Sequence, residues 1–123
     1  MWEDGLWRLT TSLVAPVAGF SYLEPKRHIP DITTLDGPEA ETLGLVLARV
    51  TSALKQATNA ELVYVNVFGE RVAHLHFNLA PHTKGDALTG GPGMLAPGAD
   101  IPEPSVLTEA AASIGRALAG NSG

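Results

Sequence analysis

Two histidines and an asparagine alternate with apolar residues between Val72 and Pro81, and this pattern offers the chain's clearest chemistry. Side chains two residues apart on a β-strand share a face, so a strand here would place His74, His76 and Asn78 side by side. The other face would carry the apolar residues Ala73, Leu75, Phe77 and Leu79, pointing into a core. Two proton-handling imidazoles and an amide on a rigid backing form a surface that can bind and react.

The alternating pattern has three interpretations. The first is an ordinary half-buried strand whose polar face carries histidines. The second is a metal site at His74 and His76, with His28, His82 or Glu70 as further ligands. The third is nucleophilic catalysis, in which an imidazole attacks phosphorus and holds the phosphoryl or nucleotidyl group while its neighbours stabilise the developing charge. A free imidazole has a pKa of about 6.5, so at pH 7 it is largely neutral and its free nitrogen can attack.

The composition excludes several classes of function. The 123 residues are 45% apolar and 17% charged, as expected for one globular domain over residues 1–123. A net charge of −5 gives no basic surface for duplex nucleic acid or an anionic membrane. The absence of cysteine excludes disulfides, thiol nucleophiles and thiolate metal sites. No apolar run approaches the roughly 20 residues that span a bilayer, and the N-terminus lacks signal-peptide features, so we expect a cytoplasmic protein.

Hydrophobic periodicity and turn residues predict an α+β fold with an antiparallel sheet. The expected elements are, in order, strands over 6–14 and 20–23, a main helix from Asp36 to 57–59, a strand over 61–68, the histidine strand and a short C-terminal helix over 105–119. Asp36 and Glu39 have the spacing of a capping box, and Asn59 suits the end of the main helix. The first two strands should form a hairpin, and strand 61–68 should pair with the histidine strand. The segment 82–104, rich in glycine and proline, is expected to be a long, mobile loop.

The motif and its context resemble the histidine-triad nucleotide-binding superfamily, whose signature is His-φ-His-φ-His-φ-φ, where φ is apolar. The run from Tyr22 to Ile29 (YLEPKRHI) resembles the family's strand that ends in Pro-Lys-x-His, and the predicted main helix follows in the same order. The run from Val65 to Val72 (VNVFGERV) resembles the family's stretch from a nucleotide-contacting asparagine to a phosphate loop. The resemblance covers roughly residues 6–81, about two thirds of the chain, and implies a histidine-triad-like fold.

The resemblance implies a role for each matched residue. His76 matches the family's nucleophile, His74 the histidine that orients and polarises the site, His28 a histidine near it, and Asn66 a nucleotide-contacting asparagine. The phosphate-contacting loop would be Gly69, Glu70 and Arg71. The implied enzyme is a hydrolase or transferase acting at the α-phosphate of a nucleoside polyphosphate, such as a dinucleoside polyphosphate, or of a phosphoramidate. The family needs no metal ligands from the protein, although Mg²⁺ can accompany a polyphosphate, and its subunits pair as homodimers with one continuous sheet.

Two departures from the family pattern leave alternatives open. Asn78 stands at the third histidine, where transferase branches carry glutamine and remain catalytic; an amide can donate a hydrogen bond but cannot act as a general acid. Glu70 and Arg71 replace the family's Gln-Ser or Gln-Thr. Arg71 can pair with phosphate, whereas Glu70 would repel it unless it turns away or pairs with Arg71. The alternatives are a nucleotide-binding protein with little or no catalysis, and a metal-binding protein that uses His74 and His76.

Two basic residues, Lys26 and Arg27, directly precede His28. Their charges have two interpretations: they steer a polyphosphate towards the site, or they belong to an ordinary solvated loop.

Overall fold

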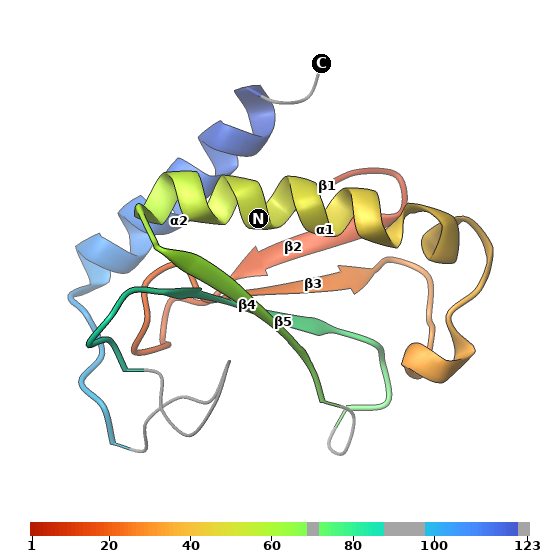
Figure 1. Ribbon diagram of the computed structural model, residues 1–123, viewed down its shortest axis with the longest axis horizontal. Coiled ribbons are helices and arrows are strands. Elements are labelled where there is room, and N and C mark those ends of the chain that lie inside the picture. The colour runs from red at the N-terminus through yellow and green to blue at the C-terminus, as the bar shows by residue number, and fades with distance from the viewer. Residues whose placement is uncertain (69–71, 88–97, 121–123) are drawn as a thin grey trace.

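The computed structural model describes residues 1–68, 72–87 and 98–120. Its elements are, in chain order, β1 (Trp2–Glu3), β2 (Trp7–Thr11), β3 (Ser21–Pro25), the 3-10 helix η1 (Ile32–Thr34), α1 (Gly37–Thr58), β4 (Leu62–Val67), β5 (Phe77–His82) and α2 (Pro104–Gly120). Within the described chain the strands form one antiparallel sheet in the order β1-β2-β3-β5-β4. Figure 1 shows α1 lying across the sheet with α2 crossing beside it. The predicted α+β fold is confirmed.

The predicted hairpin of β2 and β3 is confirmed, with Leu9 opposite Leu23. The first strand ends at Thr11 rather than residue 14, because the Ser12 hydroxyl accepts the backbone N–H groups of Val14 and Ala15 and turns the chain. Gly19 completes this turn with a φ of +89°, a backbone conformation that residues with a side chain rarely adopt.

Helix α1 begins after Asp36 and ends at Asn59, whose left-handed backbone (φ 57°) confirms the predicted C-terminal cap. The predicted capping box is wrong, because the Asp36 side chain makes no capping hydrogen bond to the helix. Asp36 and Glu39 are both held by Arg27 instead, a charged partner that local spacing did not reveal. Val50 and Leu54 are fully buried against the sheet, as the apolar stripe predicts.

Strands β4 and β5 pair antiparallel as predicted, with Asn66 opposite Asn78 and Val65 opposite Leu79. Leu79 packs with the helices in the main core, so the residues alternating with it lie on the opposite face of the sheet. We call that opposite face the helix-free face; it carries Tyr22, Tyr64, Asn66, Asn78 and Ala80.

The histidine strand is shorter than predicted, because β5 begins only at Phe77. The last pair between β3 and β5 is Leu23 with Phe77. Two residues further along β3, Pro25 has no N–H to donate, and its carbonyl accepts from the His74 side chain, so the ladder stops. His74 and His76 therefore precede the strand, and Ala73, predicted to point into the core, is exposed.

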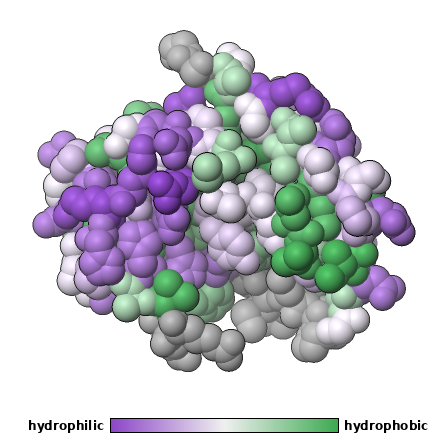
Figure 2. Space-filling view, turned by 180° about the vertical axis from the view of Figure 1, so that it is seen from behind, coloured by the Kyte–Doolittle hydropathy of each residue, from purple (hydrophilic) through white to green (hydrophobic). Residues whose placement is uncertain are grey.

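Helix α2 confirms the predicted C-terminal helix and buries Leu107, Ile114 and Leu118. The described residues between β5 and α2, 83–87 and 98–103, contain no helix or strand, and the predicted mobility of this loop stays a prediction. No helix among the described residues is long and apolar enough to cross a membrane. Seen from behind, the molecule has hydrophilic side chains gathered on one side and an apolar patch on the other (Figure 2).

Candidate active site

The segment that carries His74 and His76 is anchored by the residue between them. Leu75 is 2% exposed and belongs to the main core. Its backbone N–H donates to the carbonyl oxygen of Ile29 at 2.7 Å, which ties the segment to the loop after β3. Ile29 is itself 1% exposed. Both histidines are half-buried on either side of this anchor, so their rings are held by the fold without being shut away from solvent.

A backbone carbonyl sets the protonation pattern of His76. Its Nδ1 atom lies 3.0 Å from the carbonyl oxygen of His74. A carbonyl oxygen only accepts, so Nδ1 carries the proton, and the lone pair of the neutral ring is on Nε2. His76 Nε2 has no hydrogen-bond partner among the described residues. A neutral imidazole with an unengaged nitrogen is the form that acts as a nucleophile or ligand.

His74 is held by the end of β3. Its Nε2 atom donates to the carbonyl oxygen of Pro25 at 3.0 Å and lies 3.6 Å from a carboxylate oxygen of Glu24. The His28 ring stacks on the His74 ring, with centroids 5.4 Å apart and planes 17° from parallel. The predicted proximity of His28 to the first histidine is therefore seen in the structure, and the two rings come from segments 46 residues apart in sequence.

Three polar side chains form a row beside the histidines. Tyr22, Asn78 and Asn66 are directly opposed residues on β3, β5 and β4, in that order across the helix-free face. The Tyr22 ring centroid lies 6.4 Å from that of His76. The side-chain nitrogen of Asn66 is buried without a hydrogen-bond partner among the described residues. Such an orphaned donor is costly unless something binds it, so Asn66 is available to a ligand hydroxyl or phosphate oxygen.

The sequence pattern did not identify Tyr22 and Glu24 as site residues. The signal was present, because they alternate with buried Ser21, Leu23 and Pro25 and so share one face of β3. What the sequence lacked was the register that sets β3 directly against β5. The predicted loop Gly69, Glu70 and Arg71 lies outside the described residues, so its phosphate contacts stay a prediction.

No protein-family model and no curated protein sequence matches this chain. Solved structures do match it. A histidine triad protein from Bradyrhizobium japonicum matches with a TM-score of 0.75 and 22% identity, covering 94% of this chain and 87% of its own. A hypothetical histidine triad nucleotide-binding protein from Sulfolobus tokodaii gives 0.74 and 19% identity over 97% and 82% of the two chains. The chain has the histidine-triad fold.

A uridylyltransferase also shares this histidine-triad fold, with a TM-score of 0.67 and 22% identity over 98% of this chain and 41% of its own. The resemblance predicted from the motif and its context is thus confirmed at the level of fold. At these identities the likeness shows the fold alone, and the chemistry of this protein has to be argued from its own residues.

Metal binding has less support in these residues than nucleophilic chemistry. Among the described residues, no group of three histidine, aspartate or glutamate side chains could hold a metal ion. His82, one predicted further ligand, lies at the end of β5, where its Nδ1 atom is 3.1 Å from both carboxylate oxygens of Asp86. Glu70, another, lies outside the described residues.

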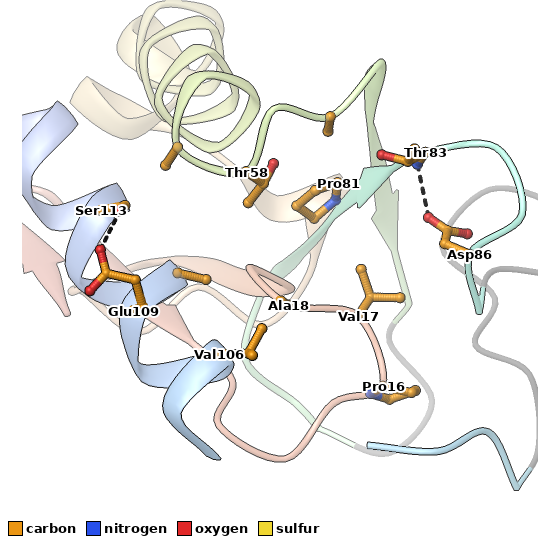
Figure 3. Close-up of a pocket in the computed structure, with 13 residues that line it drawn as sticks. Pro16, Val17, Ala18, Thr58, Pro81, Thr83, Asp86, Val106, Glu109 and Ser113 are labelled. Carbon is orange, nitrogen blue, oxygen red and sulfur yellow. Dashed lines mark hydrogen bonds between the residues drawn. The ribbon is translucent and has the colours of Figure 1, made fainter. Parts of the chain in front are cut away.

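A cavity of about 390 Å³ lies elsewhere, between the β2–β3 turn, the end of α1 and the start of α2 (Figure 3). Its polar residues already have internal partners: Asp86 accepts from the Thr83 backbone, Glu109 from Ser113, and Thr58 donates to the carbonyl of Leu54. None of the residues predicted for the site lines it. We therefore place the candidate active site of this protein at the open histidine cluster.

Proposed function

We propose that this protein is a nucleotide hydrolase or nucleotidyltransferase of the histidine-triad type. Its substrate is a nucleoside polyphosphate, such as a dinucleoside polyphosphate, or a nucleoside phosphoramidate. The observation that carries the proposal is the 3.0 Å contact between His76 Nδ1 and the His74 carbonyl, because it leaves Nε2 as the attacking nitrogen. The shared fold with histidine triad proteins and a uridylyltransferase supports the same class of chemistry.

The reaction proceeds in two displacements at the α-phosphorus. The Nε2 lone pair of His76 forms a P–N bond as the bond from phosphorus to the leaving group breaks, and its electron pair leaves with that group. Water or another acceptor then attacks phosphorus, loses its proton to solvent, and releases the nucleotide from Nε2. Asn78, which cannot supply a proton, stabilises a polyphosphate leaving group by hydrogen bonding, and an amine leaving group takes its proton from solvent.

The neighbouring residues bind and orient. His74 holds His76 through its carbonyl, and His28 stacks on the His74 ring. Both rings are proposed to orient the substrate. Asn66 supplies an N–H donor to the ribose or phosphate, since its side-chain nitrogen has no partner among the described residues. Gly69, Glu70 and Arg71 are proposed to contact phosphate. In this proposal the protein supplies no metal ligands, and Mg²⁺ would bind only together with a polyphosphate substrate.

A covalent intermediate is the decisive test. The protein is incubated briefly with adenosine and guanosine polyphosphates and phosphoramidates, quenched at high pH, where phosphoramidate bonds survive, and weighed intact by mass spectrometry. A nucleotide-sized adduct on the wild type that is absent from His76→Ala supports the proposal. Binding without adduct or product would favour the alternative, a nucleotide-binding protein with little or no catalysis. Stoichiometric zinc or iron in the purified protein would favour the metal-binding alternative instead.

We further propose that the protein is a homodimer joined through β4. This strand lies at the edge of the sheet among the described residues and is six residues long, against two for β1 at the other edge. Its side chains Val65 and Val67 are 41% and 40% exposed. An open edge with exposed apolar residues favours pairing with a second copy. It remains a prediction that a small-molecule nucleotide is the only other partner. The cytoplasmic location is likewise a prediction.

A further inference from the structure

Arg27, the residue before His28, is bound to the start of α1. Its Nη2 atom donates to the Asp36 carboxylate at 2.7 Å, the Asp36 carbonyl at 3.2 Å and the Glu39 carboxylate at 3.0 Å. Its Nε atom donates to the same Glu39 oxygen at 3.3 Å. One guanidinium therefore joins the loop after β3 to the first turn of the main helix at two carboxylates.

The Glu39 side chain makes this link firm. It is only 3% exposed, whereas those of Asp36 and Arg27 are 72% and 47% exposed. A carboxylate taken out of water needs a charged partner, and the hydrogen bond from Arg27 lowers the pKa of Glu39 and keeps it ionised. Glu39, followed by Asp36, in turn raises the pKa of Arg27. Arg27 is consequently fixed by its partners, which leaves little of its charge for steering a substrate.

His28 sits between two fixed neighbours. On one side Arg27 is held by Glu39; on the other Ile29 is 1% exposed and its carbonyl accepts from Leu75 of the histidine segment. His28 itself is exposed, so burial does not hold its ring over His74. The backbone on either side has to do so.

We propose that the Arg27–Glu39 ion pair positions His28 on His74 and so keeps the histidine cluster in its reactive arrangement. Arg27 and Glu39 are positioning residues, since they act on the cluster through His28. The effect on catalysis rests on the function proposed above, whereas the effect on the ring stack does not.

Three variants separate positioning from electrostatic steering. Glu39→Gln leaves the Arg27 charge in place but removes its buried ionic partner. Arg27→Gln removes the charge. Arg27→Lys keeps a charge beside Glu39, and so protects folding, but one ammonium group cannot reproduce the forked contacts of a guanidinium. Glu41→Gln is the matched control, because Glu41 is an exposed carboxylate two residues along the same helix.

The first readout is nuclear magnetic resonance of the imidazoles in the full chain, at a pH of about 8, with His28 assigned from His28→Gln. Stacked rings shift each other's resonances. We expect the His28 and His74 signals to move towards unstacked values in Glu39→Gln and Arg27→Gln, by a smaller amount in Arg27→Lys, and not at all in Glu41→Gln. The proposal would be overturned if the stacking is unchanged in Arg27→Lys and in whichever of Glu39→Gln and Arg27→Gln folds.

The second readout is the rate of adduct formation on His76 in a single turnover with whichever of the adenosine or guanosine polyphosphates and phosphoramidates forms the adduct in the test above. Misplaced site groups cost rate, so we expect Glu39→Gln and Arg27→Gln to react about tenfold to a hundredfold more slowly at saturating substrate, with Arg27→Lys between them and the wild type. If Arg27 instead steers the substrate by its charge, Arg27→Gln would raise the substrate concentration needed for half the maximal rate, and Glu39→Gln would react at the wild-type rate. That result would contradict positioning. An absence of adduct in the wild type with every one of those substrates would refute the proposed function, while the resonance shifts would still decide the role of the ion pair.

Discussion

Asn66 and Asn78 face each other across β4 and β5 on the helix-free face, and Asn78 follows His76 by two residues in the sequence. Asn78 is 8% exposed, and the side-chain nitrogen of Asn66 is buried without a partner among the described residues. Native proteins seldom leave a buried N–H unpaired unless it has a use. The pair of amides therefore marks where the body of a substrate is expected to lie relative to the nucleophile.

Replacing Asn66 by leucine should weaken nucleotide binding without weakening the fold. The change removes a donor to the substrate, so we expect the dissociation constant to rise about tenfold, which corresponds to ~1.4 kcal/mol. It also removes a buried N–H that no other described residue accepts, so the free energy of unfolding should stay level or rise by about 1 kcal/mol. Calorimetric titration and urea unfolding measure the two quantities. Unchanged binding together with loss of stability would mean that Asn66 has a structural role. Glu61→Gln, a change at an exposed residue near the start of the same strand, serves as the control.

Asn78→His tests which substrates the natural asparagine excludes. An imidazole at this position can protonate a leaving group, and general acid catalysis contributes about a hundredfold to ten-thousandfold. We expect hydrolysis of amine-releasing phosphoramidates to gain most of this factor and hydrolysis of polyphosphates to change little. Steady-state rates with the two substrate types measure the ratio. Asn78→Gln, which keeps an amide, should leave the ratio where it is; an equal change for both substrate types in Asn78→His would contradict the proposed role.

Tyr22 lies opposite Asn78, and its ring packs edge-on against buried Phe20 at 5.4 Å between centroids. This support holds the Tyr22 ring beside His76, where it can contact a base or sugar. We expect Tyr22→Ala to raise the KM about tenfold, the equivalent of ~1.4 kcal/mol of aromatic contact, and Tyr22→Phe to behave nearly as the wild type. A large loss in Tyr22→Phe would show that the hydroxyl matters more than the ring.

The fold could be predicted from the sequence where the signals were local. Helix α1 shows the apolar stripe through Val50 and Leu54 and the cap at Asn59, and β4 and β5 pair as their alternation indicates. The length of β5 could not be predicted in this way. It depends on Pro25 of another strand, whose missing N–H and engaged carbonyl end the ladder before His76.

The histidine cluster could be predicted only in part, for the same reason. The alternating motif predicted His74, His76 and Asn78 as site residues, and the family resemblance also predicted His28 and Asn66. The stack of His28 on His74, the orphaned nitrogen of Asn66 and the place of Tyr22 all depend on contacts between segments far apart in sequence. Asp36 and Glu39 illustrate the opposite error, since their spacing suggested a local cap while a distant arginine takes both carboxylates.

Stability should fall at acid pH in a way that reports on Glu39. Its pKa is lowered below the ordinary value of 4.5, chiefly by the hydrogen bond from Arg27, so the folded protein binds this proton less readily than the unfolded chain. The contribution to stability is thus present above a pH of about 4.5 and is lost as the pH falls through the folded-state pKa. We expect wild type to exceed Glu39→Gln in urea unfolding at pH 7, and the gap to close on acidification. A gap that stays constant from about pH 7 to pH 3 would contradict this, and Glu41→Gln should follow the wild type throughout.

The open edge of β4 predicts how the protein assembles. Lysine at Val67 would place a charge on an exposed apolar edge, which disfavours pairing of two such strands. We expect Val67→Lys to shift the mass measured by sedimentation equilibrium from dimer towards monomer. Val14→Lys is the control: Val14 is also exposed (74%) but lies in the turn between β2 and β3 and not on β4, so this change should leave the mass as in the wild type. Unfolding of the variant monomer, followed by circular dichroism, would separate a lost interface from a damaged fold. A dimer that survives in folded Val67→Lys, or a wild type that is monomeric at micromolar concentration, would rule against assembly through β4.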